Sequence, residues 1–174
     1  MQHDAALTEF DAARAEWDRA FAMVPDAALT YLKEGDDYAL GGLQVHVNWV
    51  LTHYTRVLDA IVAGGFKPVG PTDSPGESEA AGKKAQAGLT AKERSRALYD
   101  MERLHAAVLT AAGPLSEHDW SRKAAIVYGE GQDPYPTSPE DIVGWLTDHY
   151  REHVGQSSEL TTEWESKADA GERL

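Results

Sequence analysis

A pair of histidines near the C-terminal end, His149 and His153, limits the possible architecture of this chain more than any other pattern. Both lie in residues 139–160, PEDIVGWLTDHYREHVGQSSEL, a segment that predicts a helix. Residues four apart share one face of a helix, so two imidazoles at this spacing can bind one metal ion. Apolar residues and one amide share that face: Ile142, Leu146, Leu160 and Gln156. The pair should therefore point into the protein, either as metal ligands or as hydrogen-bonded core residues.

The start of this helix is marked by local signals. Ser138 can act as the N-cap, Pro139 suits the first helical position, and Glu140 and Asp141 place acidic groups in the first turn. The charged tail that follows, TTEWESKADAGERL, is expected to fray, although Trp164 could dock on the protein or on a second subunit.

Three further segments show helical periodicity. They cover approximately residues 5–24, 38–62 and 90–112, and a short helical turn is expected near residues 25–32. The third segment has a capping box, in which Thr90 is the N-cap and Glu93 its partner, and it ends at Gly113 and Pro114. Together with the C-terminal segment they predict an all-α, four-helix bundle, in which sites form between facing helices.

Two connections are long. Residues 64–88 contain six glycines and three prolines, which predicts a surface loop that acts as a lid, a crossover or a plain connector. Residues 115–137 are irregular and rich in turn formers, with a brief apolar run at 124–128 that could be extended. His118 lies in this part and is expected to be solvated.

Composition narrows the function. The 174 residues fit a single domain covering 1–174, and a net charge of −13 argues against binding nucleic acid or an anionic membrane. A small-molecule substrate suits this charge better. No cysteine is present, so any metal must be held by histidines and carboxylates. Neither a signal peptide nor a membrane span is visible, and a cytoplasmic location is expected.

A third metal ligand must come from another helix. His46 is the first candidate because it lies on the densest apolar face of residues 38–62. We take this face to be Leu43, His46, Val50, His53, Val57 and Ile61, widened by Val47, Leu51, Tyr54 and Leu58. His53 and then His105 are the alternatives. His46 and His53 lie two turns apart, about 10 Å along the axis, so they should not bind the same ion. His105 lies on the inward face of residues 90–112 and is first interpreted as a core residue or as a support for a ligand.

The residues around the histidine pair lack the motif of one class of metalloenzyme, the metalloproteases. No glutamate follows His149 directly, so the H-E-x-x-H motif of metalloproteases is absent, and Glu152 is expected at the surface. Tyr150 lies about 100° around the helix from His149. Gln156, about one turn beyond His153, is the better candidate to support a ligand.

The runs VHVNWVLTHYTRVLDAI and HYREHVGQ resemble the DinB-like (DinB/YfiT) superfamily of metal-dependent proteins. The resemblance covers most of the chain in the order and spacing of elements, and its most specific part is H-x-x-x-H-x-x-Q. It implies a four-helix bundle in an up-down-down-up arrangement, frequent homodimers, and a divalent metal held by three histidines. Three neutral imidazoles with an open fourth position suit Zn, Ni, Fe or Co. The matching positions here are His46, His149 and His153. Relatives include thiol-dependent isomerases and S-transferases.

Three functional hypotheses follow. In the first, the chain is an enzyme whose metal activates a thiol cosubstrate or water against a small electrophile, as in a thiol transferase or a hydrolase. In the second, it is a metal-dependent binding or stress-response module without turnover. In the third, the three histidines form a polar core without metal. The residues do not identify a general acid or base.

Overall fold

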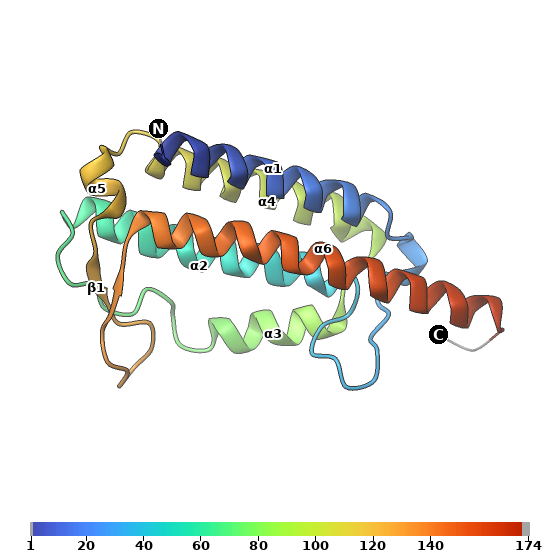
Figure 1. Ribbon diagram of the computed structural model, residues 1–174. Coiled ribbons are helices and arrows are strands. Elements are labelled where there is room, and N and C mark those ends of the chain that lie inside the picture. Colours follow the sequence, from blue (N-terminus) through green and yellow to red (C-terminus); the bar gives the residue numbers. More distant parts are fainter. Residues whose placement is uncertain (1, 172–174) are drawn as a thin grey trace.

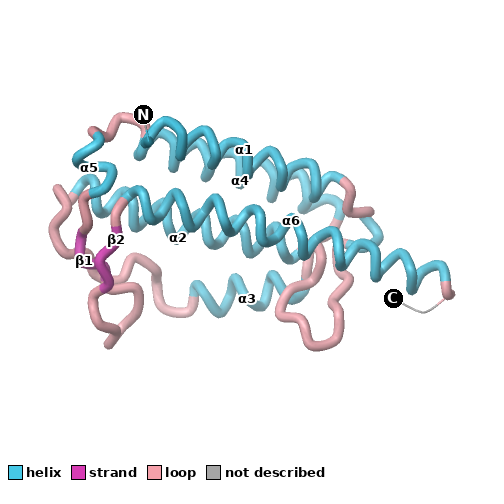
Figure 2. Tube along the Cα trace, viewed as in Figure 1, coloured by secondary structure: helices cyan, strands magenta, loops and turns pink. Residues whose placement is uncertain are grey.

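The computed structural model describes residues 2–171 and confirms an all-α bundle with an up-down-down-up arrangement (Figure 1). The minor elements include the 3-10 helix η1 and a small two-stranded sheet, and Figure 2 shows the two strands in magenta. The elements are, in order, α1 (Gln2–Ala22), η1 (Asp26–Ala28), α2 (Gly42–Ala63), α3 (Glu77–Ala87), α4 (Ala91–Ala112), α5 (Glu117–Ser121), β1 (Ala124–Ile126), β2 (Tyr135–Thr137) and α6 (Pro139–Asp169).

The core lies between the four long helices, where α1 packs on α6 and α2 packs on α4. Large side chains of α1 fill it, since Phe10, Trp17 and Phe21 are all fully buried. The indole Nε1 of Trp17 donates a hydrogen bond of 2.8 Å to Oε1 of Gln44 on α2. This bond satisfies both buried polar groups and fixes the position of α1 relative to α2.

The start of α2 differs from the expected boundary at residue 38, since the helix begins at Gly42. The backbone before it is bonded elsewhere: the amide of Ala39 donates to the carbonyl of Ala85, and that of Gly41 to the carbonyl of Leu29. Residues 39–41 therefore link the loop after α1 to α3. An amide that donates to a distant carbonyl cannot at the same time close a helical turn.

The inward face of α2 is also rotated relative to the expected one. Of the expected residues, Leu43, Val57 and Ile61 are buried, whereas Val50 and both histidines are only partly buried. The centre of the buried face is formed by Val47, Leu51 and Leu58, which were expected only to widen it, together with Gln44 and Thr55. His46 and His53 therefore lie on the flank of α2 rather than at its centre.

The expected surface loop at residues 64–88 is wrong in part, because residues 77–87 form α3. Gly76, with a φ of 83°, turns the chain into the helix, and Glu77 accepts a hydrogen bond from the amide of Ser74. The Ala, Lys and Glu residues that follow are strong helix formers, which outweighs Gly82. The segment is a crossover that returns the chain along the bundle, so that α2 and α4 run in the same direction (Figure 1).

The connection between α4 and α6 contains more structure than expected, namely α5 and a small hairpin. Strands β1 and β2 pair antiparallel, with Ala124 opposite Thr137, which confirms an extended piece in this region. Val69 of the crossover forms a further bridge to Ile126. The hairpin thus ties the crossover to the end of the bundle where α6 begins.

Helix α6 begins as expected but is longer. Ser138 and Asp141 form a reciprocal capping box, and Pro139 occupies the first turn. The helix continues to Asp169 instead of fraying after residue 160, because Glu163 accepts a hydrogen bond of 2.7 Å from the hydroxyl of Tyr31 and pairs with Lys33. Trp164 packs against the core of its own chain. The last part of the expected frayed tail, residues 172–174, lies outside the described residues.

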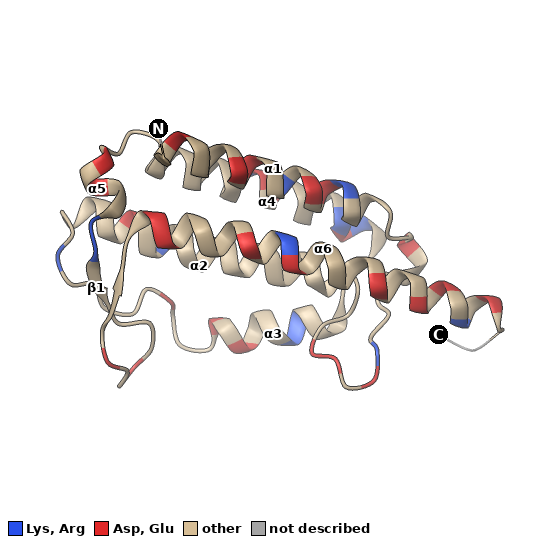
Figure 3. Ribbon diagram, in the orientation of Figure 1, with Lys and Arg blue, Asp and Glu red and all other residues tan. Residues whose placement is uncertain are grey.

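Acidic residues occur all along α1 and α6, with a few basic residues between them (Figure 3). Among the described residues, no helix has both the length and the apolar character needed to cross a membrane.

Candidate metal centre

Three histidines from two helices converge beside the crossover. His46 comes from α2, and His149 and His153 come from successive turns of the antiparallel helix α6. One ring nitrogen from each lies within 4.8 Å of the other two. The ring centroids are 4.9 Å apart for His46 and His149, 5.1 Å for His46 and His153, and 4.4 Å for His149 and His153. The structure therefore brings together the three residues that the resemblance implied, close enough for small side-chain adjustments to surround one ion.

Two ring nitrogens of this group are buried without a hydrogen bond. The Nε2 atoms of His149 and His153 are inaccessible to solvent and have no hydrogen-bond partner among the described residues. Leaving a buried polar atom unsatisfied costs about 1–3 kcal/mol. They are the only imidazole nitrogens in this condition in residues 2–171. A metal ion bound here would use their lone pairs.

The orientation of His153 is fixed by Gln156. Oε1 of Gln156 lies 2.8 Å from Nδ1 of His153, within hydrogen-bond distance. When Nδ1–H donates to this oxygen, Nε2 keeps its lone pair free, which is the tautomer that a metal ligand requires. The support expected from Gln156 is therefore present in the structure.

Tyr38, just before α2, holds the His46 ring from the other side. The two rings stack at 4.3 Å with an angle of 20° between their planes. Sequence reasoning missed Tyr38, because it was assigned to the first turn of a helix. An aromatic residue eight positions before a candidate ligand gives no periodic signal, so only the course of residues 39–41 places it here.

All three histidines are held in the neutral form. Burial lowers the pKa of His46 to about 4, with a further contribution from His153. Burial also lowers the pKa of His149 to about 3, since apolar residues such as Val47, Leu51 and Leu146 surround it. The pKa of His153 is lowered by burial as well. Neutral imidazoles are the form that binds metal ions.

These lowered pKa values predict that the metal-free protein becomes less stable against unfolding as the pH falls. Between pH 6.5 and about 4, these histidines take up protons in the unfolded chain but not in the folded one, so stability should fall as the pH falls. Within this pH window, each histidine lowers the free energy of unfolding by up to about 1.4 kcal/mol for each unit by which the pH falls. Urea unfolding of metal-free protein from pH 7.5 to 4.5 measures the slope. His149→Asn should flatten it, and an identical slope in this variant would contradict the expectation.

The remaining expected candidates lie elsewhere. Nδ1 of His53 is 2.6 Å from Oδ2 of Asp73 in the crossover, outside the cluster. His105 is a buried core residue, stacked on Phe10 and bonded to Asp11 at 2.8 Å. Neither replaces His46. His118 is exposed, as expected.

Other side chains on α6 point away from the cluster. Glu152 is exposed. The Tyr150 hydroxyl is buried and lies 3.3 Å from Nδ1 of His105, and burial raises the pKa of this tyrosine. Neither residue is positioned to exchange a proton at the three-histidine group.

A half-open pocket of about 170 Å³ adjoins His46. Its walls come from α2, from the loop before α2 and from α3, and they are formed by Tyr38, His46, Trp49, Ser78, Ala81 and Gly82. Helix α3, which the sequence did not predict, therefore covers part of the candidate centre.

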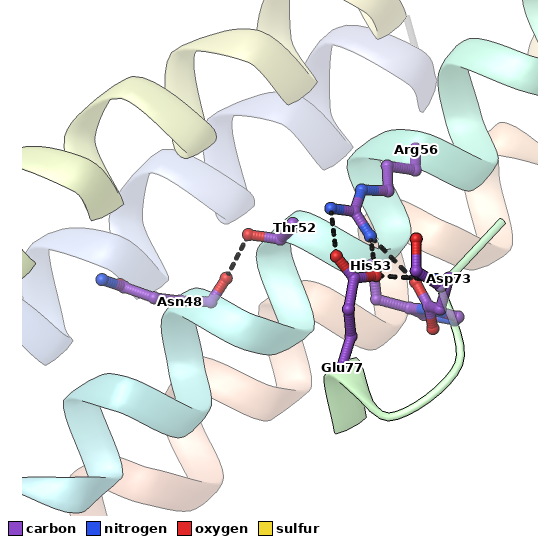
Figure 4. A network of polar contacts seen from close by, with 7 residues as sticks. Asn48, Thr52, His53, Arg56, Asp73 and Glu77 are labelled. Atoms are coloured by element: carbon purple, nitrogen blue, oxygen red, sulfur yellow. Dashed lines mark hydrogen bonds and ion pairs between the residues drawn. The ribbon is translucent and has the colours of Figure 1, made fainter. Parts of the chain in front are cut away.

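Polar contacts at the start of α3 hold it over the pocket (Figure 4). The guanidinium of Arg56 on α2 donates to both carboxylate oxygens of Glu77, at 2.7 and 3.3 Å. Arg56 also reaches Asp73, which contacts His53. At the other end, the carbonyl of Ala85 accepts from the amide of Ala39 at 3.0 Å. Both ends of α3 are thus bonded to α2 or to the residues just before it.

Comparison with known proteins shows the fold and leaves the activity open. No protein-family model and no curated protein sequence matches the chain. Among solved structures, the crystal structure of the mycothiol-dependent maleylpyruvate isomerase is similar, with a TM-score of 0.65 and 16% sequence identity. The match covers 88% of this chain, which spans 60% of that protein. This likeness is one of fold, and it agrees with the all-α bundle that the sequence predicted.

Proposed function

We propose that this DinB-like bundle binds a divalent metal ion through His46, His149 and His153 and uses it to act on a small electrophilic molecule. The observation that carries the proposal is the convergence of one ring nitrogen from each of the three histidines, together with the buried, unpartnered Nε2 atoms of His149 and His153. Burying two such atoms is costly unless something binds them.

The three ligands are of one chemical type. Three neutral imidazoles suit Zn, Ni or Fe, and three protein ligands leave a coordination position open, as in catalytic rather than structural sites. A bound divalent ion would lower the pKa of a coordinated thiol or water at that position.

The protein contributes orientation of the ligands and partly apolar surroundings. Gln156 holds the tautomer and direction of His153, and Tyr38 packs on the His46 ring. The apolar surroundings of His149 keep its imidazole neutral at physiological pH. Since the chain has no cysteine, a reacting thiol must come from a cosubstrate.

A thiol is the preferred nucleophile. A mycothiol-dependent isomerase shares the fold, which supports thiol transfer ahead of hydrolysis. A metal-dependent binding or stress-response module without turnover is the second candidate. It is favoured by the pocket lining, since none of the six described lining residues is a carboxylate or a cation that could serve as a general acid or base.

Two measurements test the proposal. Metal analysis of the purified protein without a histidine tag should give about one divalent ion per chain. Consumption of low-molecular-weight thiols with a panel of electrophiles should then depend on that ion and stop after chelation. Absence of metal would refute the proposal, and metal without turnover would select the binding module.

The homodimer implied by the resemblance stays a prediction, which light scattering checks.

A further inference from the structure

The segment that covers the pocket beside His46 is attached firmly at two points and weakly between them. Upstream, Val69 forms two backbone hydrogen bonds of 2.9 Å with the hairpin. Downstream, Ala85 is buried, and its carbonyl accepts a hydrogen bond from the amide of Ala39. Between these two points, no residue from 70 to 84 is buried. Most of α3 belongs to this weakly attached stretch.

Little apolar contact holds α3 against the bundle. A helix packed firmly on a bundle buries large apolar side chains along one face. The side of α3 that lines the pocket is formed instead by Ser78, Ala81 and Gly82. Segments with few buried apolar contacts open without unfolding the whole protein. A helix of 11 residues is marginal by itself in water, so α3 should also lose its own hydrogen bonds when it leaves α2.

Charged side chains hold the N-terminal end of α3 (Figure 4). Arg56 on α2 pairs with both Glu77 and Asp73, and Asp73 also contacts His53. The side chains of Arg56 and Glu77 remain 38% and 34% exposed. Water therefore competes for these contacts, and each such pair shifts an equilibrium by only about 1.5- to 5-fold. This end of α3 can be released by breaking a few exposed contacts.

The C-terminal end of α3 is held by buried backbone. An added Cβ on Gly42 would come within 1.6 Å of the Ala85 carbonyl oxygen, so the two backbones are in close contact. Gly88, with a φ of 78°, then turns the chain out of the helix, and Gly42, Ala85 and Gly88 are all buried. Lys84 adds an ion pair to Glu93 on α4. The two ends of α3 are therefore attached in different ways, and the N-terminal end is the weaker.

We propose that α3 is a lid over the pocket beside His46, that it swings about its C-terminal end, and that Arg56 is the latch that keeps it closed. When Arg56 releases Asp73 and Glu77, two unpaired carboxylates remain, and their mutual repulsion favours the open lid. Opening removes three of the six described lining residues from the pocket. Entry of a reactant by this route rests on the proposed function, whereas the lid itself does not.

Hydrogen exchange in the metal-free protein tests the lid. The amides of residues 80–83 should exchange at least about 100-fold faster than those of Leu51 and Leu58 in α2, relative to their intrinsic rates, because local opening exposes them. The amide of Ala39, which is bonded across the pivot, should exchange more slowly than residues 80–83. Equal protection of residues 80–83 and Leu58 would overturn the lid. Exchange of Ala39 together with residues 80–83 would overturn the pivot.

Arg56→Gln tests the latch. Loss of the contacts to two carboxylates should raise the opening equilibrium about threefold to tenfold, and exchange at residues 80–83 should accelerate by the same factor. Exchange at Leu58 in the same sample reports any change in global stability. Arg103→Gln is the matched control, since Arg103 pairs with Asp100 in its own helix, α4. Equal exchange at residues 80–83 in the two variants would overturn the latch.

A single introduced thiol measures access to the pocket, because the chain has no cysteine. Ala81→Cys places the thiol in the pocket wall, and Ala80→Cys places it at an exposed position of the same helix. A fluorescein maleimide is too bulky for a pocket of about 170 Å³, so it should react at least about tenfold more slowly with Ala81→Cys. Adding Arg56→Gln should accelerate the reaction of Ala81→Cys alone. Equal rates at the two positions, or no acceleration by Arg56→Gln, would show that α3 does not control access to the pocket.

Discussion

Replacing His149 with alanine should abolish stoichiometric metal binding. The residue supplies a buried nitrogen with no other partner, so a remaining pair of imidazoles would have to hold the ion alone. Removing a residue that only supports a ligand typically lowers metal affinity about 10–100-fold, so loss of a ligand should exceed about 100-fold. Metal analysis after dialysis, and competition with a chromogenic chelator, measure the change.

Two other variants show how large the loss of metal affinity in His149→Ala is by comparison. Gln156→Ala removes the hydrogen-bond partner of His153 and should fall within the 10–100-fold range. His118→Ala alters an exposed histidine and should retain full metal content. Stoichiometric metal in His149→Ala, or an equal loss in His53→Ala, would contradict the ligand set. A thermal shift on adding metal should likewise be present in the wild type and absent in His149→Ala.

Replacing Gly42 with alanine should detach α3 from α2. The added Cβ would lie 1.6 Å from the carbonyl oxygen and 2.6 Å from the carbonyl carbon of Ala85, so backbone must move. Overpacking of this kind costs about 1–3 kcal/mol. The midpoint of urea unfolding should fall, and trypsin should cleave faster at Lys83 and Lys84, which lie next to the displaced contact.

The matched control is Gly144→Ala in α6. Gly144 is exposed and an added Cβ would meet nothing within 4 Å, so this variant should be more stable by about 0.5–1 kcal/mol through helix propensity alone. The two substitutions are chemically identical and should have opposite signs. Wild-type stability and proteolysis in Gly42→Ala would show that α3 is not held at this contact.

The helices that local signals define were predicted well. The capping boxes at Thr90 and Ser138 are present as expected, because a cap depends on residues only three apart in the chain. Apolar periodicity likewise located α1, α2, α4 and α6. The predicted boundaries at the start of α2 and at the end of α6 were wrong because hydrogen bonds to residues distant in the chain set them. Gly41 donates to the carbonyl of Leu29, and Glu163 accepts from the hydroxyl of Tyr31.

Helix α3 was missed because its stability does not come from an apolar face. Its sequence, ESEAAGKKAQA, contains no large apolar residue and follows a run of glycines and prolines. The helix is held by the ion pair between Glu77 and Arg56 and by a close backbone approach at Gly42. Such contacts leave no periodic pattern, so the pocket that α3 covers was also invisible.

The sequence by itself determined that four amphipathic helices form a bundle and that His149 and His153 share an inward face, because periodicity and capping act within a few residues. Only the tertiary structure decided which third histidine joins them. His46 and His53 lie on the same flank of α2. The antiparallel contact between α2 and α6 brings only His46 close to His149 and His153. His53 instead contacts Asp73 in the crossover. The choice depends on how two helices pack, and side-chain spacing along one helix carries no information about the other.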